Sequence, residues 1–156
     1  WLGKCHASLF ETNFIGLRFF TVYGPRQRPD LAINKFVTAI KNQTPIKMYG
    51  DGSTSRDYTF VKDTVAGIRA AMEYESSKFE IFNLGNSYPV KLIELIESIE
   101  NVLGKKAIID SLPEQIGDVP HTLADISKAK VFLNYSPKTS LFEGLKQFIE
   151  WKESLE

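Results

Sequence analysis

The chain has 156 residues, 43% of them hydrophobic and 12% aromatic, which is enough for one globular domain with a sizeable core. Its 19 basic side chains balance 19 acidic ones, and this balance excludes the strongly charged surface that attracts nucleic acid or an anionic membrane. The single Cys5 excludes an internal disulfide, and the two histidines do not have the spacing of a structural zinc site.

The sequence shows neither a membrane span nor a targeting signal. No apolar run approaches the roughly 20 residues that a membrane helix needs, and neither end carries a signal peptide or a lipidation motif. We therefore expect a soluble protein, and the lack of an internal disulfide favours the reducing cytoplasm. The chain opens at Trp1 without an initiator Met, and residues 1–11 resemble the end of an amphipathic helix with Leu2, Cys5 and Leu9 on one side. This opening suggests a piece of a longer protein.

Strand and helix patterns alternate from residue 15 onward. Ile15–Phe20 is rich in strand-forming residues and ends at the turn residues Tyr23–Pro25, which predicts a buried strand followed by a loop. Leu31–Asn42 carries apolar residues at helical spacing. Met48 and Tyr49 then suggest a short strand, and residues 50–52 a turn.

The middle of the chain continues the alternation. Arg56–Val61 alternates as a strand does, and Asp63 is placed to cap a helix over Val65–Tyr74. Phe79–Gly85 is predicted to be another strand. Four apolar residues then recur at three- and four-residue intervals from Leu92 until Gly104 ends the pattern, which is typical of an amphipathic helix.

The last third of the chain contains more polar segments. Ala107–Ile109 suggests a strand, residues 114–122 a polar loop, and Asp125–Phe132 a short helix that begins at an aspartate cap. Ser140 and Glu143 form a capping-box pattern at the start of a final helix. Because strands and helices alternate along the whole chain, the sequence predicts an α/β fold.

Three arginines are candidate anion ligands. Arg26 and Arg28 follow a predicted strand in a proline-bounded loop, and ligand sites usually lie at the carboxyl ends of parallel strands. Arg56 follows a glycine-rich turn and could hold a phosphate through its guanidinium group. The structural alternatives are solvated surface arginines for the first two, and an ion pair with Asp57 or another acid for Arg56.

Other polar residues give weaker signals. Gln115 and Asp118 lie in the polar loop and could bind sugar or ribose hydroxyls, although the residues by themselves favour a plain turn. His121 has no Ser or Cys partner visible in the sequence, so we interpret it as an ordinary histidine. Tyr58 and Tyr74 each precede a lysine by four residues, but neither pair lies on a well-formed helix, so neither is expected to be catalytic.

Four groups of motifs follow one another along the chain. They are Leu17-Arg-Phe-Phe-Thr-Val-Tyr-Gly-Pro-Arg-Gln-Arg-Pro-Asp30, Tyr49-Gly-Asp-Gly52 with Arg56-Asp-Tyr-Thr-Phe-Val-Lys-Asp63, Phe82-Asn-Leu-Gly-Asn86, and Gly117-Asp-Val119 with Ala124-Asp-Ile-Ser-Lys-Ala129. Together, and in this order, they resemble the C-terminal half of extended short-chain dehydrogenase/reductase enzymes, and in particular UDP-glucuronate 4-epimerases. The similarity covers nearly all of the chain from about residue 15 onward.

The resemblance implies a substrate contact for five polar residues. Thr21 would face the hexose, and Arg28 would face the C5 carboxylate of a uronate. Arg56 would clamp the diphosphate, while Gln115 and Asp118 would reach the phosphate and the ribose. Many relatives have Arg in place of this Gln and Asn in place of this Thr. These differences favour a uronate over glucose or galactose as the substrate.

The same resemblance assigns further residues to the nucleotide and the cofactor. Tyr49 would pack against the uridine, and Leu31 and Ala32 would border the nucleotide. The backbone near Phe19 and Val22 would approach the nicotinamide of NAD. No catalytic residue is expected in this chain, because the glycine-rich NAD-binding turn and the helical Tyr-x-x-x-Lys pair of the family have no counterpart in it.

The resemblance also implies a domain organisation and a reaction. Residues 1–30 would be a remnant of the NAD-binding domain and residues 31–156 the sugar-nucleotide-binding domain, with residues 79–86 returning to the main sheet. The intact enzyme would epimerise a UDP-sugar at C4, whereas this chain alone would be inactive. Alternatives within the family are a UDP-glucose epimerase, a dehydratase and a decarboxylase. A stand-alone binding or self-associating module is the alternative from another class.

Overall fold

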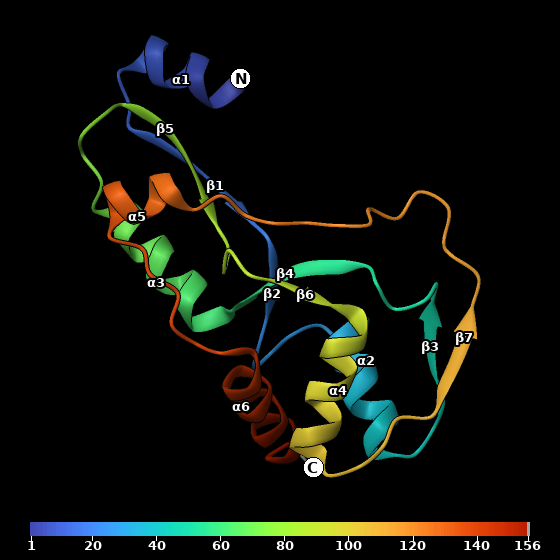
Figure 1. Cartoon of the computed structure of the whole chain (residues 1–156). Coiled ribbons are helices and arrows are strands. Elements are labelled where there is room, and N and C mark those ends of the chain that lie inside the picture. The colour runs from blue at the N-terminus through green and yellow to red at the C-terminus, as the bar shows by residue number, and fades with distance from the viewer. Residues whose placement is uncertain (156) are drawn as a thin grey trace.

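The computed structural model describes residues 1–155, which form helices and short strands in alternation (Figure 1). The helices are α1 (Leu2–Phe10), α2 (Ala32–Lys41), α3 (Val61–Met72), α4 (Leu92–Leu103), α5 (Ser127–Leu133) and α6 (Leu141–Glu153). The strands are β1 (Phe14–Phe19), β2 (Thr21–Tyr23), β3 (Ile46–Tyr49), β4 (Ser55–Phe60), β5 (Phe79–Leu84), β6 (Pro89–Lys91) and β7 (Ile109–Leu112). The α/β class predicted from the sequence is confirmed.

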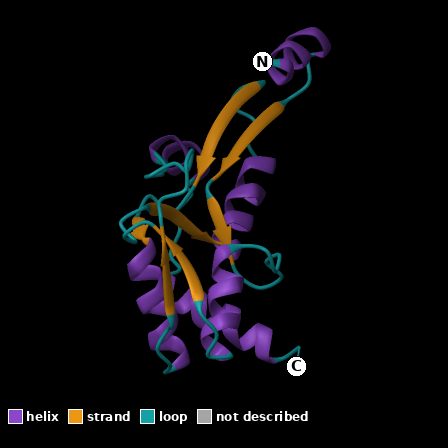
Figure 2. Cartoon of the chain, turned by 90° about the vertical axis from the view of Figure 1, so that its right-hand side faces the viewer, coloured by secondary structure: helices purple, strands orange, loops and turns teal. Residues whose placement is uncertain are grey.

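The strands form three small sheets that are mostly parallel. β1 pairs with β5, and β3 pairs with β7, each pair in parallel. The central sheet has the order β2-β4-β6, with β2 parallel and β6 antiparallel to β4. In Figure 2 the β1–β5 pair extends away from the rest of the molecule toward α1, whereas α2, α4 and α6 gather at the other end. The central sheet lies between these two parts.

Buried side chains divide into two clusters. The larger cluster joins β2, β3 and β4 to one face each of α2, α4 and α6, and its most enclosed members include Ile40, Leu95, Ile99 and Phe148. The smaller cluster joins α3, β5 and α5. Most of the apolar positions predicted for α2 and α4 are buried, because residues three and four apart share one side of a helix. Leu31 is exposed, Leu92 and Leu103 are half-buried, and the buried Leu95 was not predicted.

Several local predictions need correction. Asp63 does not cap α3: that helix begins immediately after β4 with Phe60 at the N-cap, and the Asp63 carboxylate instead accepts hydrogen bonds from the backbone of Lys138 and Thr139. The strand predicted at Ala107–Ile109 begins at Ile109. On α1, only Ala7 is buried, so the side with Leu2 and Leu9 does not face a core within the described residues.

Three residues predicted to mark the start or end of a helix do so fully or in part. Gly104 ends α4 in the left-handed conformation, with φ of 63°. The Ser140 hydroxyl accepts a hydrogen bond from the Glu143 backbone at the start of α6. Asp125 precedes the N-cap Ile126 of α5, but its carboxylate still accepts the Ser127 N–H. Within residues 1–155, no helix combines the length and the apolar character needed to cross a membrane.

Candidate functional site

A cavity of about 300 Å³ opens between the central sheet, α2 and β3. It is the place where residues from distant parts of the sequence meet. Its lining consists of Thr21, Val22, Gln27, Leu31, Ala32, Ile33, Phe36, Lys47, Tyr49, Thr54, Arg56, Tyr58, Leu92 and Asp118. Most of the residues to which the family resemblance gave a substrate contact are therefore in one cavity.

The floor of the cavity is the face of the central sheet that carries Thr21, Arg56 and Tyr58. Thr21 of β2 lies directly opposite Tyr58 of β4. Arg56 and Tyr58 share this face because side chains two residues apart in a strand point the same way. Burial raises the pKa of Tyr58 to about 12, so its hydroxyl is a neutral hydrogen-bond donor at physiological pH rather than a base.

Arg56 and Asp118 form the polar end of the cavity. The Arg56 Nη2 atom donates to Asp118 Oδ1 at 2.6 Å, and Nη1 donates to the Ser55 carbonyl at 2.9 Å. Only about a quarter of the Arg56 side chain is exposed, compared with half of the Asp118 side chain. The structural alternative weighed for Arg56, an ion pair with an acid, is thus present in the ligand-free chain. Its guanidinium group remains at the cavity wall, where an anion can replace the carboxylate.

The opposite wall comes from α2 and β3 and is apolar except for Lys47. Leu31 is the N-cap of α2 and Ala32 is its first residue, so the start of this helix borders the cavity. On β3, Lys47 and Tyr49 project from the exposed face while Ile46 and Met48 are buried. A second cavity of about 530 Å³ continues past the same Ala32, Lys47 and Tyr49. A flat or aromatic group can therefore lie against this wall.

The loop of residues 113–120, which we call the crossing loop, carries Gln115 and Asp118. It is attached at its start by the bond from Gly50 N to Leu112 O, and at its end by the bond from Ser55 N to Pro120 O, both 2.9 Å. Between these ends, Asp118 is the residue that lines the cavity. Gln115 is exposed outside the lining, and its carbonyl accepts the Asp118 N–H at 3.2 Å.

Arg28 and Phe19 also lie outside the lining of this cavity. The Arg28 side chain is 73% exposed and pairs with Asp30 at 3.0 Å, within the loop between β2 and α2. Phe19 is half exposed at the end of β1, two residues before Thr21 enters the cavity. Arg26, the other loop arginine, is exposed and has a left-handed backbone, with φ of 69°.

Sequence reasoning missed several members of the site. Gln27 lines the cavity, donates to the Val22 carbonyl at 3.3 Å, and has a buried Oε1 atom without a protein partner. Its position between two arginines gave no separate signal. Phe36 of α2 and Leu92 of α4 were predicted only as helix-face residues. No sequence motif pointed to Lys47 as a site residue.

His121 has a partner that the sequence did not reveal. Its Nδ1 atom lies 2.5 Å from the Ser55 hydroxyl, and the two residues also form an isolated parallel β-bridge. Because 66 positions separate them, no local spacing could predict the contact. This bond attaches the end of the crossing loop to β4 next to Arg56.

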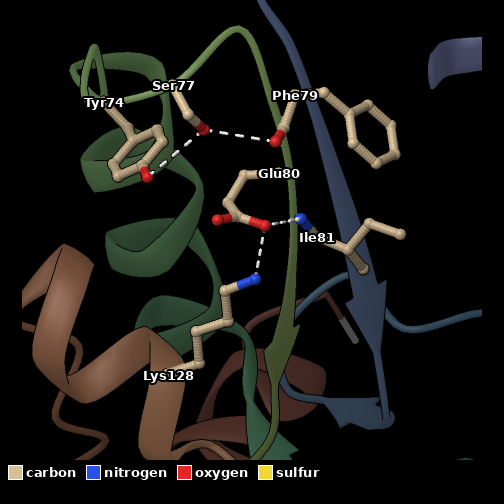
Figure 3. Close-up of polar contacts among 6 residues, drawn as sticks. All are labelled: Tyr74, Ser77, Phe79, Glu80, Ile81 and Lys128. Carbon is tan, nitrogen blue, oxygen red and sulfur yellow. Dashed lines mark hydrogen bonds and ion pairs between the residues drawn. The ribbon is translucent and has the colours of Figure 1, made fainter.

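The two Tyr–Lys spacings do not form catalytic pairs. The Lys62 ammonium group donates to Gln147 at 2.7 Å, and Tyr58 points into the cavity. Figure 3 shows that the Tyr74 hydroxyl points toward Ser77, 3.5 Å away, and that Ser77 in turn donates to the Phe79 carbonyl. The nearby Glu80–Lys128 pair lowers the pKa of Glu80 and ties α5 to β5.

Comparisons with known proteins agree with this geometry. The family model described as "NAD dependent epimerase/dehydratase family" matches residues 1–85. A UDP-glucuronate 4-epimerase of Thermodesulfobacterium geofontis is 43% identical over 157 residues, which cover 99% of this chain and 48% of that protein. The chain thus spans about half the length of the curated relatives it matches.

Solved structures give the same result. The UDP-glucuronic acid 4-epimerase of Bacillus cereus, in complex with UDP-glucuronic acid and NAD, superposes with a TM-score of 0.91 at 34% identity, over 99% of this chain and 50% of that one. The UDP-glucose 4-epimerase of Thermotoga maritima, with UDP-glucose, has a TM-score of 0.90 at 31% identity, over 98% and 50% of the two chains. The fold is therefore that of about half of a short-chain dehydrogenase/reductase-type epimerase, and the chain belongs to the NAD-dependent epimerase/dehydratase family.

Proposed function

We propose that this chain is the sugar-nucleotide-binding half of an NAD-dependent UDP-sugar 4-epimerase that acts on UDP-glucuronate and UDP-galacturonate. The observation that carries the proposal is the cavity in which Arg56 and Asp118 face an apolar wall containing Tyr49. A nucleoside diphosphate needs this combination, because its phosphates require a cation and its base requires a flat apolar surface.

The proposed contacts combine the roles that the family resemblance implies with the positions of the residues in and near the cavity. Arg56 exchanges its bond to Asp118 for the diphosphate, which frees the Asp118 carboxylate to accept hydrogen bonds from the ribose hydroxyls. Tyr49 packs against the uracil, and Leu31 and Ala32 border the nucleotide. Gln115 reaches the phosphate from the crossing loop. Anchoring the diphosphate in this way holds the sugar near the reacting groups while leaving it able to turn.

The uronate preference depends on two residues of the segment after β1. Thr21 lines the cavity and faces the hexose. Arg28 leaves Asp30 and pairs with the C5 carboxylate of the sugar, a charge-assisted contact that a neutral hexose does not offer. Relatives named as UDP-glucuronate 4-epimerases support this choice over a glucose epimerase, a dehydratase or a decarboxylase.

NAD is the cofactor that we propose for the intact enzyme. The backbone near Phe19, at the end of β1, and near Val22, at the cavity wall, approaches the nicotinamide. NAD, when bound, supplies the hydride acceptor for C4 of the sugar. The chain itself contains no glycine-rich dinucleotide turn and no helical Tyr-x-x-x-Lys pair, so we propose that it binds substrate but does not catalyse epimerisation alone.

We also propose the corresponding division of the chain. Residues 1–30 belong to the NAD-binding domain and residues 31–156 to the sugar-nucleotide-binding domain. Residues 79–86 return to the main sheet, which is supported by the parallel register of β1 with β5 from Phe14–Phe79 to Phe19–Leu84.

The decisive experiment supplies the N-terminal half of a related epimerase together with this chain, as a fusion or in trans, and assays UDP-glucuronate. We expect formation of UDP-galacturonate with NAD present, and none with this chain alone. A fusion that binds NAD and UDP-glucuronate but forms no C4 epimer would contradict the proposed reaction.

A self-associating module is the second candidate. The observation that favours it is the exposure of Leu2, Leu9 and Phe10 on α1, whose exposed fractions are 88%, 76% and 65%. Apolar side chains gathered on a surface in this way promote association. Binding of UDP separates the two candidates, because a module that only associates has no reason to bind a nucleotide.

A further inference from the structure

We propose that Asp57 is a positioning residue that fixes the orientation of Arg56 in the candidate site. It rests on the proposed function, because the ligand to be oriented is a nucleoside diphosphate. Asp57 lies on β4 between Arg56 and Tyr58, but its side chain points to the opposite face of the strand and is completely buried.

The Asp57 carboxylate is surrounded by hydrogen-bond donors. Oδ1 accepts from Asn86 N at 2.7 Å and from the Thr59 hydroxyl at 3.3 Å. Oδ2 accepts from Ser87 N at 2.9 Å and from Ala124 N at 3.0 Å. Within residues 1–155 no lysine, arginine or histidine pairs with Asp57, so its partners are these uncharged donors. An ionised carboxylate, which only accepts, matches this set of donors.

These bonds join three segments that are far apart in the sequence. β4 supplies Arg56 to the cavity, and Asn86 and Ser87 precede β6 and α4. Ala124 follows the crossing loop, which carries Asp118. The backbone N–H of Asp57 also donates to the Thr122 hydroxyl at 3.3 Å. One side chain therefore holds the strand that carries Arg56 against the two segments that contain Asn86 and Ala124.

The packing around Asp57 leaves little freedom. A Cβ atom on Gly85 would lie 2.3 Å from Ala124 Cβ and 3.0 Å from Asp57 Oδ2, so the segments approach as closely as a glycine permits. Ser87 has a left-handed backbone, with φ of 56°, which a non-glycine residue rarely adopts. Its N–H bond to Asp57 holds it there. This rigidity lets a carboxylate on one face of β4 control the cavity on the other face.

The test compares the affinities of the whole chain for UDP and for uridine by titration calorimetry. Asp57→Asn keeps one accepting oxygen but places an amide NH₂ against backbone donors. We expect UDP affinity to fall about tenfold, because the Arg56 guanidinium group is no longer held in the orientation that binds the diphosphate. Uridine has no phosphate, so its affinity should change less than about twofold. In an Arg56→Met background, Asp57→Asn should reduce UDP affinity no further.

Asp63→Asn is the matched control. It removes a carboxylate that also accepts two backbone N–H groups, but from residues 138 and 139, outside the cavity. We expect it to leave the ratio of UDP to uridine affinity unchanged. If Asp57→Asn lowers both affinities equally, or adds to the effect of Arg56→Met, Asp57 is only structural and the inference is overturned. No UDP binding by the unaltered chain would overturn the proposed function as well.

A double variant keeps the inference testable if Asp57→Asn alone does not fold. If Asp57→Asn does not fold, the same titrations are made with Asp57→Asn combined with Ser87→Gly, since glycine adopts the left-handed conformation without strain. Ser87→Gly alone should bind UDP as the unaltered chain does. A selective loss of UDP affinity in the double variant supports the inference, and an unchanged ratio of affinities overturns it.

Discussion

Arg56 is the residue on which nucleotide binding depends most directly. We predict that Arg56→Met raises the Kd for UDP by roughly 10- to 100-fold, the range expected when a charge-assisted contact is lost. Arg56→Lys should recover part of the affinity, because lysine keeps the charge but not the two-pronged geometry. Arg69→Met, a matched change at an exposed arginine on α3, should have no effect. Equal UDP affinities for Arg56→Met and the unaltered chain would show that Arg56 does not bind the diphosphate.

Arg28 tests the uronate assignment separately. In the ligand-free chain it is largely exposed and paired with Asp30. We predict that Arg28→Met lowers affinity for UDP-glucuronate at least about fivefold, but lowers affinity for UDP-glucose less than about twofold, since only the uronate has a carboxylate to lose. Competition against a fluorescent UDP derivative measures both affinities. Equal losses for the two sugars would remove the reason for choosing a uronate.

Sequence motifs predicted which residues belong to the candidate site when those residues lie within a motif of the family. Arg56 and Asp118 are 62 positions apart, yet both were placed by resemblance and both line the cavity. The Ser55–His121 contact and the bonds of Asp57 could not be predicted, because β-bridges and backbone donors from distant segments create them. Lys47 and Gln27 became site residues only when β3 and the loop before α2 folded against the sheet.

Helix α4 shows how far local sequence determines an element. Its apolar spacing and Gly104 predicted both its face and its end. By contrast, α3 begins earlier than predicted, because Val61 follows β4 directly and no side chain caps the helix. β7 is displaced from its predicted position because its register is set by pairing with β3. Elements with their own end signals are thus predictable, whereas those ended by tertiary contacts are not.

Gly104 tests how much the left-handed end of α4 contributes to stability. Its φ is 63°, and a Cβ atom there would meet nothing within 4 Å. We predict that Gly104→Ala lowers the free energy of unfolding by about 1 kcal/mol through backbone strain alone. Gly104→Asn should cost less, because asparagine tolerates this conformation better. Urea denaturation measures both, and equal costs for the two variants would contradict this explanation.

Glu100 makes the end of α4 sensitive to acid. Its carboxylate accepts bonds from Lys106 Nζ at 2.6 Å and Ala107 N at 2.8 Å. Desolvation raises the pKa of Glu100, but these bonds together outweigh it, so the pKa is lowered. A lowered folded-state pKa stabilises the protein above the unfolded value of about 4.5, and this contribution is lost as the pH falls through the folded value.

We therefore predict that Glu100→Gln reduces stability at pH 7 by up to about 1 kcal/mol, since solvent screens the pair at the exposed Lys106 ammonium group. The difference from the unaltered chain should shrink below pH 4. Urea midpoints at the two pH values measure it. Glu97→Gln, on the same helix, is the control. A difference that grows in acid would contradict the assigned direction.

The whole molecule is uneven in how it buries its apolar residues. The larger cluster buries apolar side chains of the central sheet against α2, α4 and α6. The β1–β5 end has one strand pair and an α1 that buries only Ala7 (Figure 1). Composition predicted a chain able to form a core, but could not predict this imbalance, because the sequence of α1 is as apolar as that of a buried helix. Most of the apolar side chains of α1 are therefore exposed.

We predict that the chain by itself associates in solution through α1. In sedimentation velocity at concentrations on the order of tens of micromolar, the unaltered chain should sediment faster than a monomer, because exposed apolar surface favours self-contact. Leu9→Glu combined with Phe10→Lys should return it to a monomer without changing the net charge. Met72→Glu combined with Val131→Lys changes two equally exposed apolar residues away from α1 and should leave association intact. If both pairs of substitutions abolish association, or the unaltered chain is already a monomer, the α1 surface is not responsible.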